Sequence, residues 1–393
     1  AARSRAQTLG LPTNTLESWR YVRLAPLAKP PTTARSPLGA SAADRARLPG
    51  IAAVLVLVDG AYRADLSNLG ALPSGLRAQD LLRVEAAEGE RLVGRWSSEI
   101  ASATDVTACW SFADGGGGLC LTAEGAVPAP VHIISIVSGG ISGARVSIEL
   151  GRAATVDLAI THLALGAARS SIGFDVGCAA GSVLRVDETQ FGPASAGAQV
   201  FGGMTARLSR DAQLTWNIAA CGSELTRFTA DATLAEVNSA VALSGTTVLD
   251  GTRQLHNHVR VRHQVGPTTS TQLFKTIADG SSTASFDGLV AIAKGADGSQ
   301  ATQRNNNLLL SPSARVDTRP QLDILADDVK AGHGATVGRL DADELFYLRT
   351  RGLDAGTARA VLTRAFAAEV IELMHLPAMR ELAQREILGA LGR

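Results

Sequence analysis

Short apolar runs dominate the middle of the chain. From about residue 130 to 330, runs of alternating or continuous β-branched and aliphatic residues are separated by Gly, Asp, Ser and Asn. This texture predicts β-strands. Examples are VHIISIV (131–137), RVSIEL (145–150), TVDLAI (155–160), HVRVRH (258–263), GLVAIA (288–293), NLLL (307–310) and QLDIL (321–325). Between about 260 and 325 the runs return roughly every 14 to 19 residues, which favours successive rungs of a parallel β-helix. A sandwich of antiparallel strands has a similar texture and stays open as an alternative.

The period changes to 3.6 residues after Gly338 and predicts three helices. Asp341 is the expected cap of a short helix that carries Leu345, Phe346 and Leu348 and ends at Gly352. Asp354 is the expected cap of a second helix, and Pro377 separates it from the last one. The apolar stripe predicted for the second helix consists of Ala358, Val361, Leu362, Ala365, Phe366, Val370 and Leu373.

The N-terminal part of the chain is more mixed. Thr15 is placed to cap a helix with Trp19 and Val22 on one face, residues 30–50 are expected to form a loop, and IAAVLVLVDG (51–60) predicts a buried strand that ends in a turn. We therefore expect three regions. They are a mixed, partly helical region at 1–128, a β-helix core at 129–338 and a helical domain at 339–393.

Charge and composition exclude several classes of function. The 37 basic residues balance the 37 acidic ones, so no net field favours nucleic acid or an anionic membrane. The longest apolar run, Ile51 to Val58, is far shorter than the roughly 20 residues that cross a bilayer. The first residues, AARSRAQTLG, lack the apolar stretch of a secretory signal. We expect a cytoplasmic protein, or one of an organelle matrix.

Neither the cysteines nor the glycine run predicts a cofactor. Cys109, Cys120, Cys178 and Cys221 are far apart and form no CxxC pair, so we expect buried thiols and no stably bound cluster or zinc. The segment DGGGGL (114–119) lacks the Gly-Lys-Ser/Thr ending of a phosphate-binding loop.

Several polar residues are candidates for chemistry or contacts. His333 stands between two glycines, which lets its imidazole approach a metal or a partner, although a His that only hydrogen-bonds a turn remains the alternative. His256 and His258 form an HxH pair with His263 nearby; stacked surface histidines explain this spacing more simply than a metal site does. Asp327 and Asp328 are adjacent, which is typical of turn or interface residues. The cluster of Phe346, Tyr347, Arg349 and Arg351 has the composition of an interface hot spot.

Longer motifs resemble the SufB/SufD family and are nearer to its SufD members. They comprise LLLS (308–311), PQLDILADDVK (320–330), HGAT (333–336) and FYLRTRG (346–352). Two upstream stretches, HVRVRHQVGPTTSTQLFKTIADGSSTASFDGLV (258–290) and LPTNTLESWRY (11–21), are also similar to that family. The resemblance covers most of residues 11–375 and is vague between 30 and 250.

This resemblance implies a right-handed parallel β-helix and a non-catalytic scaffold role in iron–sulfur cluster assembly. A SufD-like chain pairs edge to edge with SufB, here through Leu322, Ile324, Asp327, Asp328 and Lys330, and also forms a possible homodimer without SufB. It binds the ATPase SufC through the C-terminal helices, here through Phe346, Tyr347, Arg349 and Arg351. His333 is the residue implied beside a transient cluster at the SufB interface. Some members carry a Cys two residues before this His, whereas Ala331 stands here. The implied location is the cytoplasm or the plastid stroma.

Two kinds of alternative remain. The first is a β-helix enzyme, either an acyltransferase or a lyase, with His333 as the catalytic residue; the sequence lacks the strict six-residue repeat of the former and the clustered charges of the latter. The second is a SufB chain, for which a late cysteine is expected, but the last cysteine is Cys221.

Overall fold

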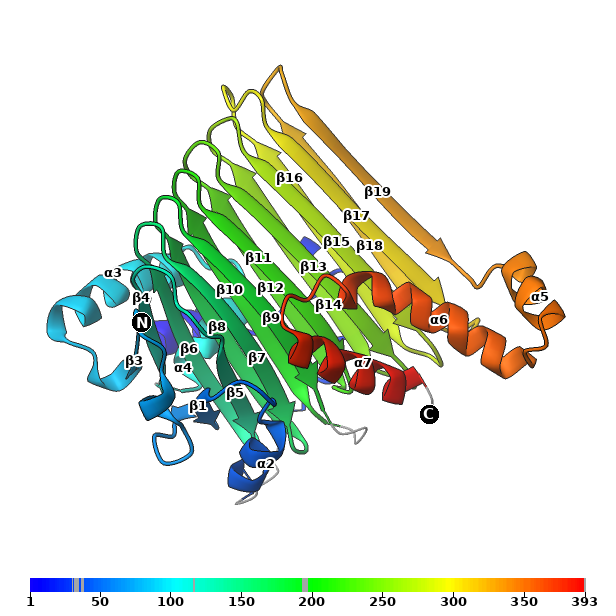
Figure 1. The fold of residues 1–393 in the computed structure, drawn as a ribbon, viewed down its shortest axis with the longest axis horizontal. Coiled ribbons are helices and arrows are strands. Elements are labelled where there is room, and N and C mark those ends of the chain that lie inside the picture. Colours follow the sequence, from blue (N-terminus) through cyan, green and yellow to red (C-terminus); the bar gives the residue numbers. More distant parts are fainter. Residues whose placement is uncertain (30, 32–34, 37–38, 116, 193–196, 392–393) are drawn as a thin grey trace.

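The computed structural model describes residues 1–29, 31, 35–36, 39–115, 117–192 and 197–391 (Figure 1). Its strands form two long sheets, and successive strands from β4 onward alternate between them. Each strand of the central array pairs in parallel with the strand two places before it and the strand two places after it. The chain therefore winds as a parallel β-helix with two strands in each turn.

The strands of the first sheet, here sheet A, are β1 (Ala53–Val58), β2 (Ala61–Tyr62), β5 (Val131–Val137), β7 (Thr155–Ala164), β9 (Val183–Phe191), β11 (Gln213–Cys221), β13 (Ala240–Leu249), β15 (Thr269–Ala278), β17 (Gln300–Leu309) and β19 (Lys330–Gly338). The strands of the second, sheet B, are β3 (Leu76–Asp80), β4 (Gly117–Ala123), β6 (Gly140–Leu150), β8 (Ala168–Cys178), β10 (Gln199–Leu208), β12 (Leu225–Leu234), β14 (Gln254–His263), β16 (Thr283–Ile292) and β18 (Arg315–Ile324). Two short antiparallel pairings, β1 with β2 and β3 with β4, close the N-terminal end.

The register explains how the sequence builds this core. Val186 on β9 lies beside Trp216 on β11, and Trp216 lies beside Leu243 on β13, so side chains of successive turns stack in rows. Because side chains alternate along a strand, every second residue points between the sheets, and these residues form one large apolar cluster. Corners of the turns also stack: Gly280 has a φ of 61°, and a Cβ there would lie 2.8 Å from the backbone nitrogen of Gly251.

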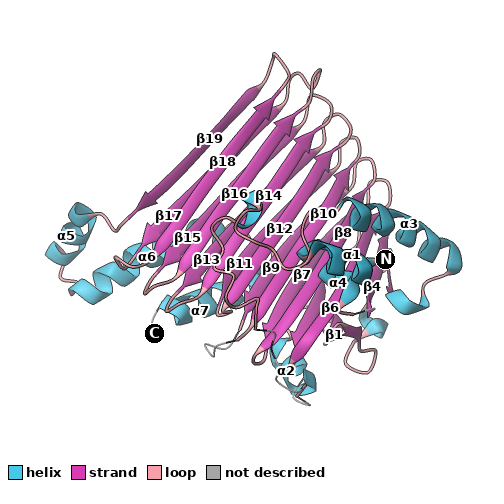
Figure 2. Cartoon of the chain, turned by 180° about the vertical axis from the view of Figure 1, so that it is seen from behind, coloured by secondary structure: helices cyan, strands magenta, loops and turns pink. Residues whose placement is uncertain are grey.

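The helices lie at the two ends of the chain, and all except α5 lie against the strands (Figures 1 and 2). They are α1 (Ala2–Leu9), α2 (Gly39–Ala46), α3 (Ala86–Ser102), α4 (Thr107–Ala113), α5 (Ala342–Thr350), α6 (Ala355–Ile371) and α7 (Pro377–Leu391). Short 3₁₀ turns stand at Glu17–Trp19, Leu69–Ala71 and Leu81–Arg83. Helices α6 and α7 lie on the outer face of sheet A, whereas α1, α3 and α4 lie on the side of sheet B. None of the helices within the described residues is long and apolar enough to cross a membrane.

The prediction of a mainly β fold with a parallel β-helix between helical ends is confirmed, with about 8 turns, 44% strand and 24% helix. Parallel pairing excludes the antiparallel sandwich. The expected strand at 51–60 is present as β1, and Asp341 and Asp354 cap α5 and α6 as expected. The division into three domains stays a prediction. The boundary at 338 does coincide with the end of β19.

Two local expectations at the N-terminal end are wrong. Thr15 caps no helix: residues Glu17–Trp19 form a single 3₁₀ turn, and Trp19 is held by tertiary contacts instead. The described part of the predicted loop at 30–50 contains α2, whose Ala42 and Ala43 pack against Val54 and Ile134. An alanine-rich segment has a good helix propensity, and packing on the sheet stabilises it.

Candidate functional site

The last turn of the β-helix is open. Strands β18 and β19 stand at the ends of their sheets, and each pairs with a single strand within the described part of the chain. The outer edge of each therefore presents backbone N–H and C=O groups without a ladder partner, which is a template for another strand. Exposed apolar side chains accompany this edge: Leu325 is 65% exposed, and Ile324 and Val337 are also exposed.

A row of inward-facing side chains leads to His333 on this open turn. The row runs from Leu243 on β13 to Gln272 on β15, Gln303 on β17 and His333 on β19, each beside the next in register. Gln303 is fully buried, and its Nε2 donates to Oε1 of Gln272 over 2.9 Å. Oε1 of Gln303 and Nε2 of Gln272 have no hydrogen-bond partner within the described residues. The interior thus changes from apolar to amide-lined toward the open end.

His333 lies within strand β19, fully flanked by strand residues, and not in a turn. Leu322 and Ile324 belong to β18, which ends at Ile324, and the chain then bends before β19.

The remaining residues predicted for this surface lie close together around that bend. Backbone amides of Asp327 and Asp328 donate to Oδ1 of Asp297, over 3.2 and 3.3 Å. Lys330 is exposed at the start of β19, whereas Leu322 is half-buried against the cluster around Val290. The open turn therefore brings the predicted edge residues and His333 to one end of the molecule.

Helix α5 is a second exposed feature. It projects away from the sheets at the end of β19 (Figure 1), and none of its residues is buried. Phe346 is 68% exposed and Tyr347 is 56% exposed. Arg351 stands over the Tyr347 ring at 5.1 Å, and its Nη2 donates to the Tyr347 hydroxyl over 3.3 Å. An aromatic and arginine group on a helix with no core contacts has the composition of a docking site.

Helices α6 and α7 are attached firmly to sheet A. One apolar cluster joins side chains of the two helices and of the connection between them to the sheet. It contains Ala367 and Ile371 of α6, Met374 of the connection, Met379, Ala383 and Ile387 of α7, and Ala159, Ala219, Val248, Ile277 and Leu308 of sheet A. Polar contacts reinforce the attachment. The buried ammonium of Lys275 donates to the Phe366 carbonyl over 3.0 Å and forms an ion pair with Glu369. The backbone nitrogen of Leu376 donates to Asp187 over 2.7 Å.

The three candidate metal-binding histidines do not converge. His256 and His258 point outward from β14, whereas His263 points inward, and each ring bonds to nearby groups. His256 contacts Ser285 at 2.7 Å, His258 contacts Asp287 at 3.0 Å, and His263 contacts Thr268 at 2.7 Å. Burial lowers the pKa of His256 to about 3 and that of His263 to about 4, so both rings are neutral at pH 7. Across the described residues, no group of three or more His, Cys, Asp or Glu side chains is placed to hold a metal ion.

Three of the cysteines are buried, and Cys221 is half-buried beside α7. Burial raises the pKa of the Cys120 thiol to about 11 and that of Cys178 to about 12. Such thiols stay protonated at neutral pH and are poor ligands and nucleophiles.

Sequence reasoning missed one feature near the open turn. The segment around Glu17–Trp19 crosses the outer face of sheet B as a strap: Glu17 forms an ion pair with Arg319 on β18, and the Ser18 carbonyl accepts from Arg227 over 3.0 Å. Arg319 also forms an ion pair with Asp287, at 3.0 Å. No local pattern could reveal a contact between residues about 300 positions apart, although Glu17 lies in the motif at 11–21 and Arg319 directly precedes the motif at 320–330.

Fold and site together define a class: a parallel β-helix with an open terminal turn and a projecting, exposed helix. Residues 134–366 match the family described as SUF system FeS cluster assembly, SufBD core domain. The chain belongs to this family.

Curated relatives agree. The chain is similar to the iron–sulfur cluster assembly protein SufD of Escherichia coli, with 41% identity over 133 residues, or 34% of this chain and 30% of that protein. A SufBD family protein of Synechocystis shares 40% over 162 residues, covering 40% and 35% of the two chains. Protein ABCI7, chloroplastic, of Arabidopsis thaliana shares 41% over 145 residues, covering 37% and 30%. The matched part spans about a third of the length of each relative.

Proposed function

We propose that this chain is a SufD-type scaffold subunit, which pairs with a SufB-type chain and binds a SufC-type ATPase while an iron–sulfur cluster is assembled. The single observation that carries the proposal is the open terminal turn, where an unpaired strand edge and His333 share one surface in a chain of the SufBD family. In this role the chain is not an enzyme. The cluster is cargo and not a resident cofactor.

The pairing surface is the edge of β18 and β19. Strand addition supplies main-chain hydrogen bonds along the edge, and the exposed side chains of Ile324, Leu325 and Val337 supply apolar area at the same place. Lys330, Asp327 and Asp328 surround it with charges of both signs, which are suited to fixing the register of a partner. A second copy of this chain is a weaker occupant of the same edge when the SufB-type partner is absent.

His333 is the residue placed to contact the cargo. Its side chain is exposed on β19, and a neutral imidazole is a suitable ligand for iron. Ligation is transient in this proposal, because the described residues contain no group of three or more His, Cys, Asp or Glu side chains that could hold a metal ion.

Helix α5 is the proposed docking site for the ATPase. Phe346 and Tyr347 are large, exposed and free of core contacts, and Arg349 and Arg351 flank them. Since α5 is joined to α6, which packs on sheet A, movement of a bound ATPase reaches the β-helix directly. The proposed location is the cytoplasm, or the stroma in a plastid.

Affinity purification from the native host tests the proposal. The tagged chain is expected to recover a SufB-type and a SufC-type protein in stoichiometric amounts, and the purified chain alone to show no ATP hydrolysis and no iron–sulfur absorbance. Recovery of neither partner, or robust hydrolysis by the chain alone, contradicts the scaffold role.

A further inference from the structure

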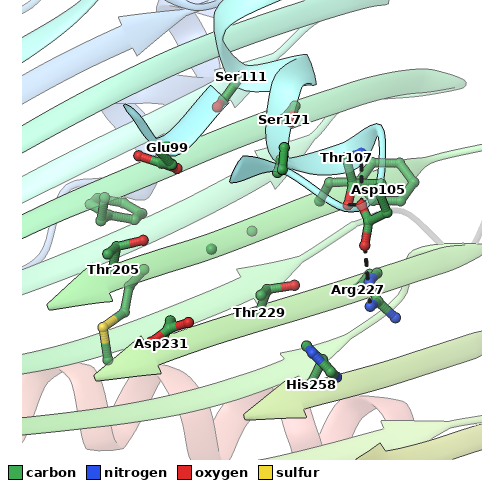
Figure 3. Close-up of a pocket in the computed structure, with 18 of the residues that line it drawn as sticks. Glu99, Asp105, Thr107, Ser111, Ser171, Thr205, Arg227, Thr229, Asp231 and His258 are labelled. Carbon is green, nitrogen blue, oxygen red and sulfur yellow. Dashed lines mark hydrogen bonds and ion pairs between the residues drawn. The ribbon is translucent and has the colours of Figure 1, made fainter. Parts of the chain in front are cut away.

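A pocket of about 380 Å³ lies on the outer face of sheet B, away from the open turn (Figure 3). Its floor comes from strands β6, β8, β10, β12 and β14, and its roof from the segment that joins α3 to α4. This volume is within the range of small-molecule sites, which begins at about 300 Å³. Ser171, Thr205 and Thr229 line it with hydroxyl groups, whereas Phe201 and Met204 add apolar surface.

Four arginines line the pocket, and two of them are fully engaged by carboxylates. Arg145 is shared between Glu99 and Asp175, and Arg262 pairs with Asp231. Glu99 is itself a weakened partner, because burial raises the pKa of its carboxyl. Of the other two arginines, Arg227 has one distant carboxylate, Asp105 at 3.9 Å, and Arg260 has no ion pair among the described residues.

Arg227 is buried but incompletely partnered. Its Nη1 donates to the Ser18 carbonyl over 3.0 Å, its guanidinium stands 4.3 Å from the centre of the Trp19 ring, and its Nη2 lies 3.9 Å from Asp105. Nε and Nη2 have no hydrogen-bond acceptor among the described residues. A buried guanidinium in this state leaves a positive field at the pocket wall, because burial weakens screening by water.

Arg260 adds to this field. It is half-buried at the pocket, and the described residues give it no hydrogen bond or ion pair. The two positive charges affect the neighbouring His258. Burial is the main cause that lowers the pKa of His258; Arg227 and Arg260 lower it further, and the hydrogen bond with Asp287 opposes them. Thr229 lies two residues after Arg227 on β12 and beside His258 in register, and Arg260 lies two residues after His258 on β14.

We propose that this pocket binds a small molecule through an oxyanion group, phosphate or carboxylate, that contacts Arg260 and Thr229 and faces the buried charge of Arg227. The remainder of the ligand occupies the space beside Phe201 and Met204. The site is distinct from the terminal turn and from α5. It does not depend on the scaffold role.

Isothermal titration of the purified chain tests this site. Sodium pyrophosphate and sodium citrate are titrated separately at low ionic strength, with ribose as an uncharged probe. At least one anion is expected to bind saturably, and binding weakens as salt is added. Pyrophosphate binding alone identifies a phosphate ligand, and citrate binding alone a carboxylate.

Variants decide whether the pocket is responsible. Arg260→Gln is expected to weaken anion binding at least about tenfold, the size of a lost charge-assisted hydrogen bond. Thr229→Val weakens it less. Arg207→Gln is the matched control, because Arg207 lies outside the pocket on β10 and reaches only Gln264, at 3.5 Å; it changes binding less than about twofold. The proposal is overturned if neither anion binds, if ribose binds as tightly, or if Arg207→Gln weakens binding as much as Arg260→Gln.

Discussion

His333 lies on the terminal strand, with its side chain exposed and its register partner Gln303 fully buried. The imidazole adds little to the packed interior, since its strand is the outermost one of sheet A. A residue in this setting is free to serve a partner, and its loss costs the fold little.

His333→Ala is therefore expected to leave the thermal unfolding midpoint within about 2 °C of the wild type, because surface substitutions usually change stability by less than about 0.5 kcal/mol. Complementation of a strain that depends on this assembly system is expected to fail. Thr336→Ala, an exposed change on the same strand, is the control and should complement fully. Normal growth with His333→Ala would show that the imidazole is not needed for cluster assembly.

Buried histidines predict the acid sensitivity of the fold. Burial lowers the pKa of His132 and His256 to about 3 and of His263 to about 4, compared with about 6.5 in an unfolded chain. Between these values the unfolded state binds more protons than the folded state, so stability falls as the pH falls from about 6.5 toward 4.

Urea unfolding at pH 7 and pH 5 measures this slope. Each histidine contributes up to about 1.4 kcal/mol per pH unit below its unfolded pKa. His256→Gln keeps a side chain able to bond Ser285 and does not titrate, so it should reduce the loss of stability between the two pH values. An unchanged pH dependence in His256→Gln contradicts the assignment of a buried neutral ring.

At the scale of elements, some predictions from local pattern hold and others fail for a physical reason. Asp341 and Asp354 were identifiable because a cap is a short-range contact, and the structure shows both accepting from the first backbone amides of their helices. The apolar stripe of α6 was only partly right: Ala358 and Val370 are buried, but Val361 is 40% exposed and Leu373 is 50% exposed. An alanine-rich helix has apolar residues on several faces, and only the sheet decides which face is covered.

Helix α5 provides the element-scale prediction. Phe346→Ala combined with Tyr347→Ala is expected to weaken binding of the SufC-type ATPase at least about thirtyfold, since interface anchors of this kind contribute about 2 kcal/mol or more. No residue of α5 is buried, so the unfolding midpoint should stay unchanged. Val361→Ala, an exposed apolar change on α6, is the control. The affinity for the ATPase is measured by titration calorimetry. If the double variant binds the ATPase as tightly as Val361→Ala does, the ATPase docks elsewhere.

At the scale of the whole molecule, the regular return of apolar runs favoured a parallel β-helix, because each turn repeats the same inward pattern. The runs alone left an antiparallel sandwich open, and the family resemblance was needed to choose between the two folds. The amide-lined interior at Gln272 and Gln303 was not predictable, since polar residues in a strand usually face water. The contacts of Glu17 with Arg319 and of Lys275 with Glu369 depend on segments distant in sequence. Such contacts become visible only when the turns are assembled.

Removal of residues 339–393 tests how far the C-terminal helices belong to the β-helix. The cut uncovers Ala219, Val248, Ile277 and Leu308 on sheet A, and each large apolar side chain fully uncovered costs about 1.5–3 kcal/mol. Lys275 also loses its contacts with the Phe366 carbonyl and Glu369. The 1–338 fragment is therefore expected to lose ATPase binding and also to unfold at a lower temperature than the full chain.

Comparing the fragment with Phe346→Ala/Tyr347→Ala distinguishes a loss of docking from a loss of stability. The double variant is expected to lose ATPase binding while α6 and α7 still cover sheet A. Thermal unfolding and pull-downs with both partners are measured on the fragment, the double variant and the full chain. The SufB-type partner is expected to bind all three, since the edges of β18 and β19 are intact in each. If the fragment unfolds at the same temperature as the full chain, residues 339–393 form an independent domain. A fragment that keeps the ATPase but loses the SufB-type partner reverses the assignment of the two surfaces.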